Sequence, residues 1–408
     1  MLSQQLKEFI AAHFNDDTGK LVMSASKYPK IDVKLAATII EARKKLISKV
    51  PEWAENENLI YTSSLSTEQS SSSKTAIYKQ NYCKKGNVAD LTGGMGIDSY
   101  FFAKVNRQVI YIEKNPDLFK ATINNFLELG ATNIVSINEE FNSINGDSLI
   151  RDVLNKHAIE RLDLIYLDPS RRKTGGKRVH FINEYEPRIN ELKEILFRYS
   201  EIILIKISPM ADIKSVKQEV EEVKSIEIVA VNNECKELLI LLEKGSKVNF
   251  EQIEIRAVNL KDKKNDEQIV FTPEIENKTI SIFGTPLVGN YLYEPNAAIL
   301  KAGAFKFISY KYDVQKLEVN THLYTSDKII DNFPGRHFKI IEVADFDKIS
   351  IRNLRKTYPK ANISVRNLPL SATELRDRLK IEDGGDITIF GCTISKGVKK
   401  LITCTFAN

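Results

Sequence analysis

The sequence is poor in cysteine, with four in 408 residues, and these are scattered without a C-x-x-C pair or the Cys/His spacing of a zinc site. This argues against a disulfide framework and a structural zinc, so we expect no metal site and a reducing, cytoplasmic compartment. Long apolar runs are also missing: none approaches the ~20 residues that span a bilayer, and no charged-then-apolar leader is present. No membrane segment is expected.

A strong net charge is missing too, because 59 Lys and Arg stand against 54 Asp and Glu and leave +5. The excess is concentrated in residues 331–408, which contain 14 Lys and Arg and 9 Asp and Glu. A basic end suits an anionic partner such as nucleic acid. A solvated surface produces the same imbalance, so the composition alone leaves both interpretations open.

At 408 residues the chain is too long for one typical core, so several domains are expected. Residues 1–60 have the apolar spacing of helices and predict an N-terminal helical domain. The serine-rich stretch 62–74 fits either a flexible linker or the capped start of a helix. Residues 61–245 alternate short apolar runs with helix-length segments, which is typical of a doubly wound α/β sheet. A small linking α+β module over 246–322 and a basic α+β domain over 323–408 complete the expected division.

Seven apolar runs predict the strands of the sheet, at 88–91, 109–113, 134–137, 162–168, 201–208, 226–232 and 236–243. The helix-length segments between the earlier runs predict parallel strands joined by right-handed crossovers. The last two runs are separated by only about three residues, so they predict an antiparallel hairpin. The expected topology is five parallel strands closed by a terminal antiparallel pair.

Glycines follow the first predicted strand in "VADLTGGMGID", where Asp90 ends the strand and Gly94 and Gly96 precede a helix. Glycine permits a positive φ and a close approach of the backbone to a ligand. The dinucleotide fingerprint G-x-G-x-x-G is incomplete, because Ser99 stands in place of the third glycine. What remains is D-x-x-x-G-x-G, whose acid can bind an amine-bearing ligand such as the methionine part of S-adenosylmethionine (SAM).

Acidic residues also follow the next two predicted strands. Glu113 stands 17 residues after Gly96, where a carboxylate can accept both ribose hydroxyls of a nucleoside cofactor. A helix-dipole partner for the helix that begins near Asn115 is the alternative, and the agreement of strand, loop and acid favours ribose binding. Asn138 and Glu139 follow the third strand as candidate contacts to an adenine amine.

The fourth predicted strand runs into "LDPSRRKTGGKR", where basic residues crowd the loop after an acid at the strand end. Ligands of open α/β sheets bind beyond the carboxyl ends of the strands, so Asp168 and Pro169 are expected to position the reacting group. Arginine can stack on a base or clamp a phosphate, although an exposed loop paired with nearby glutamates would look the same. The expected substrate-binding residues are Ser170, Arg171, Arg172 and Lys173.

Two further segments are candidates for the substrate side. Lys206 ends the fifth predicted strand, where its side chain can face the crevice. The segment 293–296, "YEPN", fits either a domain junction or a substrate contact. Positions 168–176 contain no cysteine, so base methylation through a covalent cysteine is not expected.

The predicted hairpin distinguishes two cofactor classes, because a nicotinamide-type sheet is parallel throughout and a SAM-dependent methyltransferase core ends in such a hairpin. Residues 87–243 resemble a class I SAM-dependent methyltransferase. More specifically, the chain is similar to a group of bacterial proteins, classed as methyltransferases, with a THUMP-like C-terminal domain. The resemblance covers most of 68–381 and rests on "EQSSSS", "DLTGGMGID", "DPSRR", "GKRV", "IKISPMADI", "YEPNAAILKAGAFK" and "ISVRNLPLSATELRDRLK".

The resemblance implies a Rossmann-like sheet, SAM as cofactor, and an N-terminal helical domain and small C-terminal α+β modules around the sheet. It aligns Asp168-Pro169 with the Asp-Pro-Pro-Tyr motif with which some methyltransferases hold the exocyclic amine of a nucleobase. Ser170 and Arg171 replace the second proline and the aromatic, so an amine target does not follow from the resemblance. The residues expected to bind SAM are Asp90, Thr92, Gly94, Gly96, Asp98, Glu113 and Glu139.

We therefore interpret the chain as a SAM-dependent methyltransferase (EC 2.1.1.-) that methylates a nucleobase of RNA by direct transfer. THUMP domains are associated with RNA-modifying enzymes, so tRNA or rRNA is the expected partner, and neither DNA nor a membrane is expected. Two alternatives stay open. One is a methyltransferase of a protein or small molecule, and the other is a non-catalytic RNA-binding protein that retains the SAM fold.

Overall fold

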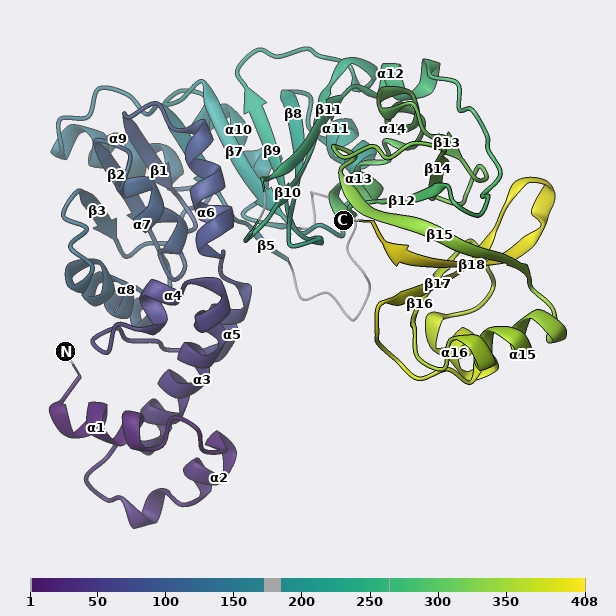
Figure 1. The fold of residues 1–408 in the computed structure, drawn as a ribbon. Helices are drawn as coiled ribbons and strands as arrows, with labels where there is room; N and C mark the ends of the chain where they lie inside the picture. Colours follow the sequence, from purple (N-terminus) through teal and green to yellow (C-terminus); the bar gives the residue numbers. More distant parts are fainter. Residues whose placement is uncertain (1, 172–184, 264, 408) are drawn as a thin grey trace. The chain divides into compact units, whose positions relative to one another are not determined.

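The computed structural model describes residues 2–171, 185–263 and 265–407. The chain divides into two compact units (Figure 1). The first comprises Met1–Lys224 with Leu238–Val248, and the second comprises Ser225–Glu237 with Asn249–Asn408. Within the described ranges, none of the helices combines the length and the hydropathy needed to cross a membrane.

Helices make up the N-terminal part of the first unit, as the apolar spacing predicts. They are α1 (Gln4–Ala12), α2 (Thr18–Met23), α3 (Val33–Lys49), α4 (Pro51–Ala54), α5 (Ser64–Gln69) and α6 (Ser73–Lys79). The side chains of Ser3, Asp17 and Asp32 accept backbone N–H groups that the first turns would otherwise leave unpaired. The serine-rich stretch is the capped start of helices, because Ser63 caps α5 and Ser72 caps α6.

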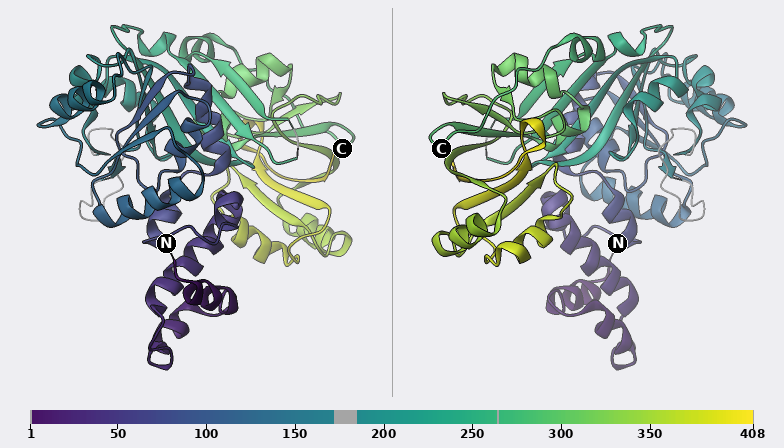
Figure 2. Two further views of the ribbon diagram at one scale, coloured as in Figure 1. Left: turned by 90° about the vertical axis from the view of Figure 1, so that its left-hand side faces the viewer. Right: turned by 90° about the vertical axis from the view of Figure 1, so that its right-hand side faces the viewer.

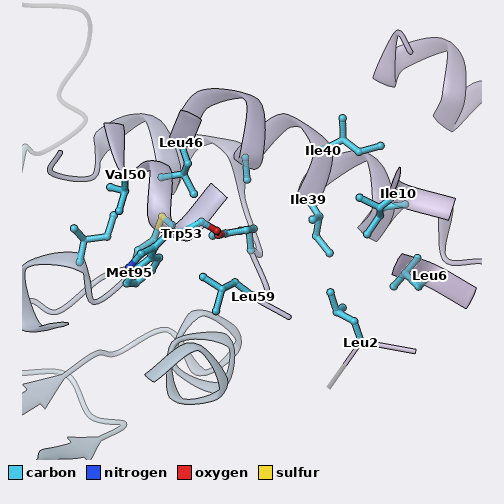
Figure 3. Packing of buried hydrophobic residues seen from close by; sticks show 14 of the residues in the cluster. Leu2, Leu6, Ile10, Ile39, Ile40, Leu46, Val50, Trp53, Leu59 and Met95 are labelled. Atoms are coloured by element: carbon cyan, nitrogen blue, oxygen red, sulfur yellow. The ribbon is translucent and has the colours of Figure 1, made fainter. Parts of the chain in front are cut away.

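The apolar core of these helices continues into the loop of residues 91–96, here called the glycine loop. Trp53 is fully buried, and its ring meets that of Tyr100 edge-on with 5.7 Å between centroids. Figure 3 shows Met95 of the glycine loop beside Trp53, with Leu6 toward the other end of the same cluster. The N-terminal helices therefore stabilise the glycine loop by direct packing.

The sheet of the first unit contains the predicted strands. Its members are β1 (Asn87–Asp90), β2 (Gln108–Ile112), β3 (Ile134–Ile137), β4 (Leu164–Leu167), β7 (Ile202–Ile207) and β9 (Glu234–Glu243). The first five pair in parallel in the order β3-β2-β1-β4-β7, and β9 lies antiparallel to β7. β8 (Val223–Val231) is next to β9 in the strand order, so the predicted Rossmann-like topology with a terminal hairpin is confirmed.

Helices connect the parallel strands (Figure 1). They are α7 (Ile97–Ala103), α8 (Pro116–Glu128), α9 (Gly146–Lys156), α10 (Ile189–Leu196) and α11 (Ile213–Glu219). In the sheet Asp90 is level with Tyr111 of β2 and Tyr166 of β4. The loops that follow these three strands therefore start at the same edge of the sheet, where ligands of such folds bind.

The sheet has two further strands that the sequence did not predict. β10 (Glu254–Leu260) pairs in parallel with β8, and β11 (Glu267–Phe271) pairs antiparallel with β10. The full order is β11-β10-β8-β9-β7-β4-β1-β2-β3. Ile255, Ala257 and Val258 of β10 are buried, which explains why this strand is apolar.

A second, seven-stranded sheet has the order β13-β14-β12-β15-β18-β17-β16. Its strands are β12 (Tyr291–Pro295), β13 (Gln315–Lys316), β14 (Tyr324–Ser326), β15 (Gly335–Asp345), β16 (Asn362–Arg366), β17 (Ile387–Thr393) and β18 (Lys399–Phe406). Its neighbouring strands are antiparallel, apart from the parallel pair β16 and β17. This mixed sheet with helices confirms a separate C-terminal α+β part.

Helices of the second unit are α12 (Pro273–Lys278), α13 (Ala297–Ala302), α14 (Phe305–Tyr312), α15 (Lys348–Thr357) and α16 (Ala372–Leu379). Leu354 of α15 and Leu375 of α16 pack in one apolar cluster with Ile389 of β17. The next residue, Phe390, belongs to another cluster, because successive side chains of a strand point to opposite faces. Figure 2 shows α15 and α16 on one side of these green-to-yellow strands.

We expect Trp53→Ala to lower the free energy of unfolding by about 3–5 kcal/mol, because it leaves a cavity between the N-terminal helices and the glycine loop. Urea unfolding of the full chain, followed by far-UV circular dichroism, measures the change. Met23→Ala is the control, since this side chain is 89% exposed. Equal stability of the two variants would contradict the structural role of the shared core.

Candidate active site

A cleft of about 450 Å³ lies beyond the carboxyl ends of β1 to β4. Thr92 lines it after β1, Glu113 after β2, Glu139 in the segment after β3, and Asp168 and Ser170 after β4. These five predicted site residues, which are far apart in the sequence, therefore meet in one cavity. It is the place where ligands of open α/β sheets bind.

The glycine loop has a backbone that other residues adopt with difficulty. Gly94 and Gly96 have φ values of 54° and 76°. A Cβ added to Gly96 would lie 2.5 Å from Cζ of Phe126 and 2.6 Å from Cγ2 of Thr122, so the loop is packed tightly on α8. At Gly94 the nearest atom to such a Cβ is the Thr92 carbonyl oxygen at 3.8 Å. Gly96 is therefore required for packing, and Gly94 leaves open space beside the loop.

Glu113 connects the glycine loop to the start of α8. Its Oε2 accepts the Gly94 N–H at 2.9 Å, and its Oε1 accepts the Asn115 N–H at 2.7 Å. Asn115 is the N-cap of α8, so the helix-terminus role considered for Glu113 is present. Each carboxylate oxygen accepts more than one hydrogen bond, and Glu113 also lines the cleft. Ribose binding by Glu113 is thus compatible with its contacts and stays a prediction.

Asp90 lies beneath the glycine loop and is not among the described residues that line the cleft. It is 1% exposed, and it accepts the Thr92 N–H at 3.2 Å and the Ser99 hydroxyl at 2.6 Å. Burial raises the pKa of Asp90 to about 7. The hydrogen bond from Ser99 acts to lower this pKa, and the negative charge of Asp98 acts to raise it. Ser99, which interrupts the dinucleotide fingerprint, therefore has an internal partner. Direct contact of Asp90 with a ligand stays a prediction.

Asp98 stands in the first turn of α7 and is also absent from the described lining of the cleft. Its Oδ2 accepts hydrogen bonds from Ser71 at 2.7 Å and from the Tyr166 hydroxyl at 2.9 Å, and its Oδ1 lies 3.1 Å from Nζ of Lys79. Burial acts to raise the pKa of Asp98, but the charges of Lys79 and Lys206 and the hydrogen bonds outweigh it and lower the pKa. The predicted contact of Asp98 with a cofactor stays a prediction.

Asp168 forms an ion pair with Lys206, whose Nζ lies 2.5 Å from its Oδ2. The side chain of Asp168 is 35% exposed and that of Lys206 is 10% exposed, so the carboxylate is accessible from the cleft. Burial of the rest of this side chain raises the pKa of Asp168, and the positive charge and hydrogen bond of Lys206 act to lower it. The sequence placed Lys206 near the substrate but missed this pair. The parallel register of β4 and β7 explains the pair, because it puts Leu167 level with Ile205, and this register is seen only in the structure.

The segment that follows Asp168 is described at its two ends. Pro169 is buried, and β5 (Ser170–Arg171) pairs antiparallel with β6 (Tyr185–Glu186). Ser170 and Glu186 line the cleft. Arg172 and Lys173, which were expected to bind substrate, lie outside the described residues, as does the rest of the basic loop. The substrate roles of Ser170 and Arg171 stay predictions.

The described lining of the cleft is acidic. Lys114 is paired with Glu140 at 2.9 Å, and Arg188 with Glu191 at 2.7 Å, so both cations are already partnered. An acidic lining attracts a cationic ligand and repels a phosphate. Six acidic residues, Glu113, Glu139, Glu140, Asp168, Glu186 and Glu191, accompany these two cations.

We expect Gly96→Ala to destabilise the protein more than Gly130→Ala. Both glycines have positive φ, but a Cβ at Gly130 has nothing within 4 Å, whereas one at Gly96 overlaps Phe126 and Thr122. The backbone alone costs about 1–2 kcal/mol, and the overlap adds about 1–3 kcal/mol at Gly96. Urea unfolding of both variants measures the difference. Equal losses would mean that the loop is not packed on α8 as described.

Comparisons with known proteins agree with this architecture. Residues 291–334 match the model of a ferredoxin-like domain, and residues 335–405 match that of a THUMP domain-like family. A search of curated protein sequences finds no match.

Two distant solved structures are a proposed RNA methyltransferase from Pyrococcus horikoshii and an rRNA methylase from Streptococcus thermophilus. The first is 14% identical over 42% of this chain and 81% of its own, with a TM-score of 0.29. The second is 17% identical over 42% and 94%, with a TM-score of 0.28, and neither adds to the assignment.

One solved structure covers the whole molecule. It is the crystal structure of a proposed methyltransferase from Porphyromonas gingivalis W83, which is 33% identical and has a TM-score of 0.86 over 100% of both chains. The agreement extends from the N-terminal helices through the Rossmann-like sheet to the C-terminal domains. The chain therefore belongs to the family of this Porphyromonas gingivalis protein, class I methyltransferases with a THUMP-like C-terminal domain.

Proposed function

We propose that the protein transfers a methyl group from SAM to a nucleobase of RNA. The observation that carries this proposal is the cleft in which Thr92, Glu113, Glu139 and Asp168 meet beside the glycine loop. Family membership supplies the class of reaction, and the cleft supplies a place for it. The identity of the acceptor is the further step that the experiments below test.

The chemistry of the cleft suits SAM better than a dinucleotide. SAM has a sulfonium and an ammonium group, and the described lining contains six acidic and two basic residues. Among the described lining residues, the pyrophosphate of a nicotinamide dinucleotide would meet mainly carboxylates, which repel it. The open space at Gly94 allows a ligand to approach the backbone closely. Glu113 would then accept the ribose hydroxyls, and Glu139 would contact the adenine amine.

Asp90 and Asp98 have a different part in this arrangement. Both are buried beneath the cleft, so in this proposal they hold the glycine loop and contribute negative charge near the ammonium group. Asp90 titrates near pH 7, so it is ionised above that pH and protonated below it. A cationic ligand is favoured by the ionised form, and we therefore expect SAM to bind more tightly above pH 7.

Asp168 is the residue placed to hold the acceptor. Bound SAM supplies an electrophilic methyl group, so the protein needs mainly to align the attacking atom. The exposed carboxylate of Asp168 can accept a hydrogen bond from an N–H group of the acceptor, and Lys206 keeps that carboxylate in place. As the carbon–nitrogen bond forms and the carbon–sulfur bond breaks, the nitrogen loses a proton. The raised pKa of Asp168 makes it a better acceptor for this proton than a surface carboxylate.

RNA as the substrate is supported by the C-terminal domain. Residues 335–405 match a THUMP domain-like family, and residues 331–408 contain the excess of basic residues. Arg352 and Lys356 of α15, together with Lys399 of β18, are exposed and available for phosphates. Contacts of this kind are independent of sequence and sensitive to salt.

A second candidate acceptor is an amine of a protein. The acidic lining that suits SAM would also suit a positively charged side chain entering the cleft, and it does not by itself attract a phosphate backbone. This candidate uses the same Asp168 and differs only in the molecule that presents the nitrogen. The two candidate acceptors are distinguished by whether the methyl group is found in RNA or in protein.

We expect Glu113→Gln to weaken SAM binding about 10- to 100-fold, because a charge-assisted hydrogen bond contributes about 1.5–3 kcal/mol. Isothermal titration calorimetry of the full chain with SAM at pH 8 measures the dissociation constant. Glu160→Gln is the matched control, since Glu160 is exposed and is not among the described residues that line the cleft. Unchanged affinity of Glu113→Gln, or tighter binding of NAD than of SAM, would contradict the cofactor assignment.

We expect label from methyl-labelled SAM to enter RNA from a strain that lacks this protein, and Asp168→Asn to slow the transfer at least about 100-fold. Protein and small-molecule extracts of the same strain are assayed in parallel. Asp152→Asn is the control, since its side chain is 74% exposed. Label confined to protein would select the amine candidate. Full activity of Asp168→Asn with normal SAM affinity would overturn the role of Asp168.

A further inference from the structure

One lysine of the first unit is buried without any exposure to solvent. Lys79, at the end of α6, is 0% exposed. Its Nζ lies 3.1 Å from Oδ1 of Asp98 and donates a hydrogen bond to the Ser71 hydroxyl at 3.1 Å. A buried lysine is destabilising unless its charge is compensated, and buried ion pairs are weak sources of stability. Neither Lys79 nor Ser71 has a part in the proposed reaction.

Asp98 connects this lysine to both sides of the cleft. It stands two positions after Gly96, so it belongs to the helix that the glycine loop begins. It also accepts the Tyr166 hydroxyl at 2.9 Å, and Tyr166 stands two positions before Asp168 on β4. A single carboxylate thus joins the serine-rich segment, the glycine loop and the strand that precedes Asp168.

We propose that Lys79 is a positioning residue of the active site, which acts through Asp98 on the glycine loop and on the charges of Asp90 and Asp168. Lys79 neutralises Asp98, and Asp98 in turn holds Tyr166 and the first turn of α7. The role in methyl transfer rests on the proposed function, whereas the charge arrangement can be measured independently of it.

Three carboxylates and two lysines lie in or below the floor of the cleft. Lys79 is paired with Asp98 and Lys206 with Asp168, whereas Asp90 has hydrogen bonds from Ser99 and Thr92 and no ion pair among the described residues. Asp98 and, more weakly, Asp168 contribute to the raised pKa of Asp90. Tyr111 of β2, which is level with Asp90, is a further titratable neighbour, and burial raises its own pKa, so it stays neutral.

Removal of the Lys79 charge has a defined consequence in this cluster. Without its main cation, the buried Asp98 binds a proton and loses its negative charge. Neutral Asp98 no longer raises the pKa of Asp90, so Asp90 ionises at a lower pH. Replacement of Asp98 by asparagine has the same effect on Asp90. Removal of the Lys79 charge and replacement of Asp98 together should therefore lower the midpoint of the Asp90 titration no further than either change does alone.

The experiment is a pH titration of the full chain labelled with ¹³C at the aspartate carboxyl carbons. The Asp90 signal is assigned by its loss in Asp90→Asn. We expect a midpoint of about 7 in the unaltered protein. In Lys79→Met and in Lys79→Met/Asp98→Asn we expect it to move toward about pH 6, because the charge lost is that of Asp98, the neighbour of the Ser99 that donates to Asp90. The double variant replaces the buried pair by neutral side chains, so it keeps the test available if the single variant fails to fold.

Lys84→Met is the matched control, because Lys84 is an exposed lysine in the same unit. SAM titrations at pH 6 and pH 8 accompany the spectra. The unaltered protein and the control should lose about tenfold in affinity at the lower pH. The two test variants should lose less, because Asp90 stays ionised. A lower melting temperature with an unmoved Asp90 midpoint would show a merely structural lysine and overturn the proposal. Absence of SAM binding by the unaltered protein would overturn the proposed function and leave the midpoint as the test of Lys79.

Discussion

Hydrogen bonds between backbones continue past the ends of the parallel strands and hold the loops of the cleft in register. The Leu91 N–H donates to the Tyr166 carbonyl at 3.1 Å, and the Gly93 N–H donates to the Ile112 carbonyl at 2.8 Å. The Asp168 N–H then donates to the Thr92 hydroxyl at 2.6 Å. The first strand therefore positions the loops on both of its sides. Glu113, the glycine loop and Asp168 meet only because this register is maintained beyond the sheet itself.

Sequence patterns predicted those parts of the site that depend on local structure. Apolar runs of the right length marked all seven strands of the methyltransferase-type sheet, because both faces of a parallel sheet are buried. Acids at strand ends indicated Glu113 and Asp168 as candidates, and both line the described cleft. The direction in which a side chain at a strand end points could not be predicted in the same way. Asp90 and Asp98 turn inward because Ser99, Ser71 and Lys79 satisfy them, and no local pattern shows contacts with side chains brought in by another helix. The sequence also does not show which strands or which side chains pair with one another. The pairing of β10 with β8 and that of Asp168 with Lys206 therefore followed only from the structure.

The N-terminal helices and the serine-rich segment contribute to the site without lining its cleft. Trp53 and Met95 share one core, so the helical part packs against the loop that the proposed cofactor approaches. The serine caps of α5 and α6 place Ser71 and Lys79 beneath the following helix, where they meet Asp98. The described contacts of the "EQSSSS" motif are those of helix capping, packing and electrostatics.

The boundary between the ferredoxin-like and THUMP-like segments, at residues 334 and 335, falls inside one sheet. β12 on one side of this boundary pairs with β15 on the other, and Glu294 of β12 is 3% exposed and paired with both Arg336 and Arg366. A recombination event that separated the two segments would leave β15 with an unpaired edge and Glu294 without its cations, a state prone to aggregation. We therefore expect the two segments to be inherited, lost or grafted onto another enzyme as a single piece.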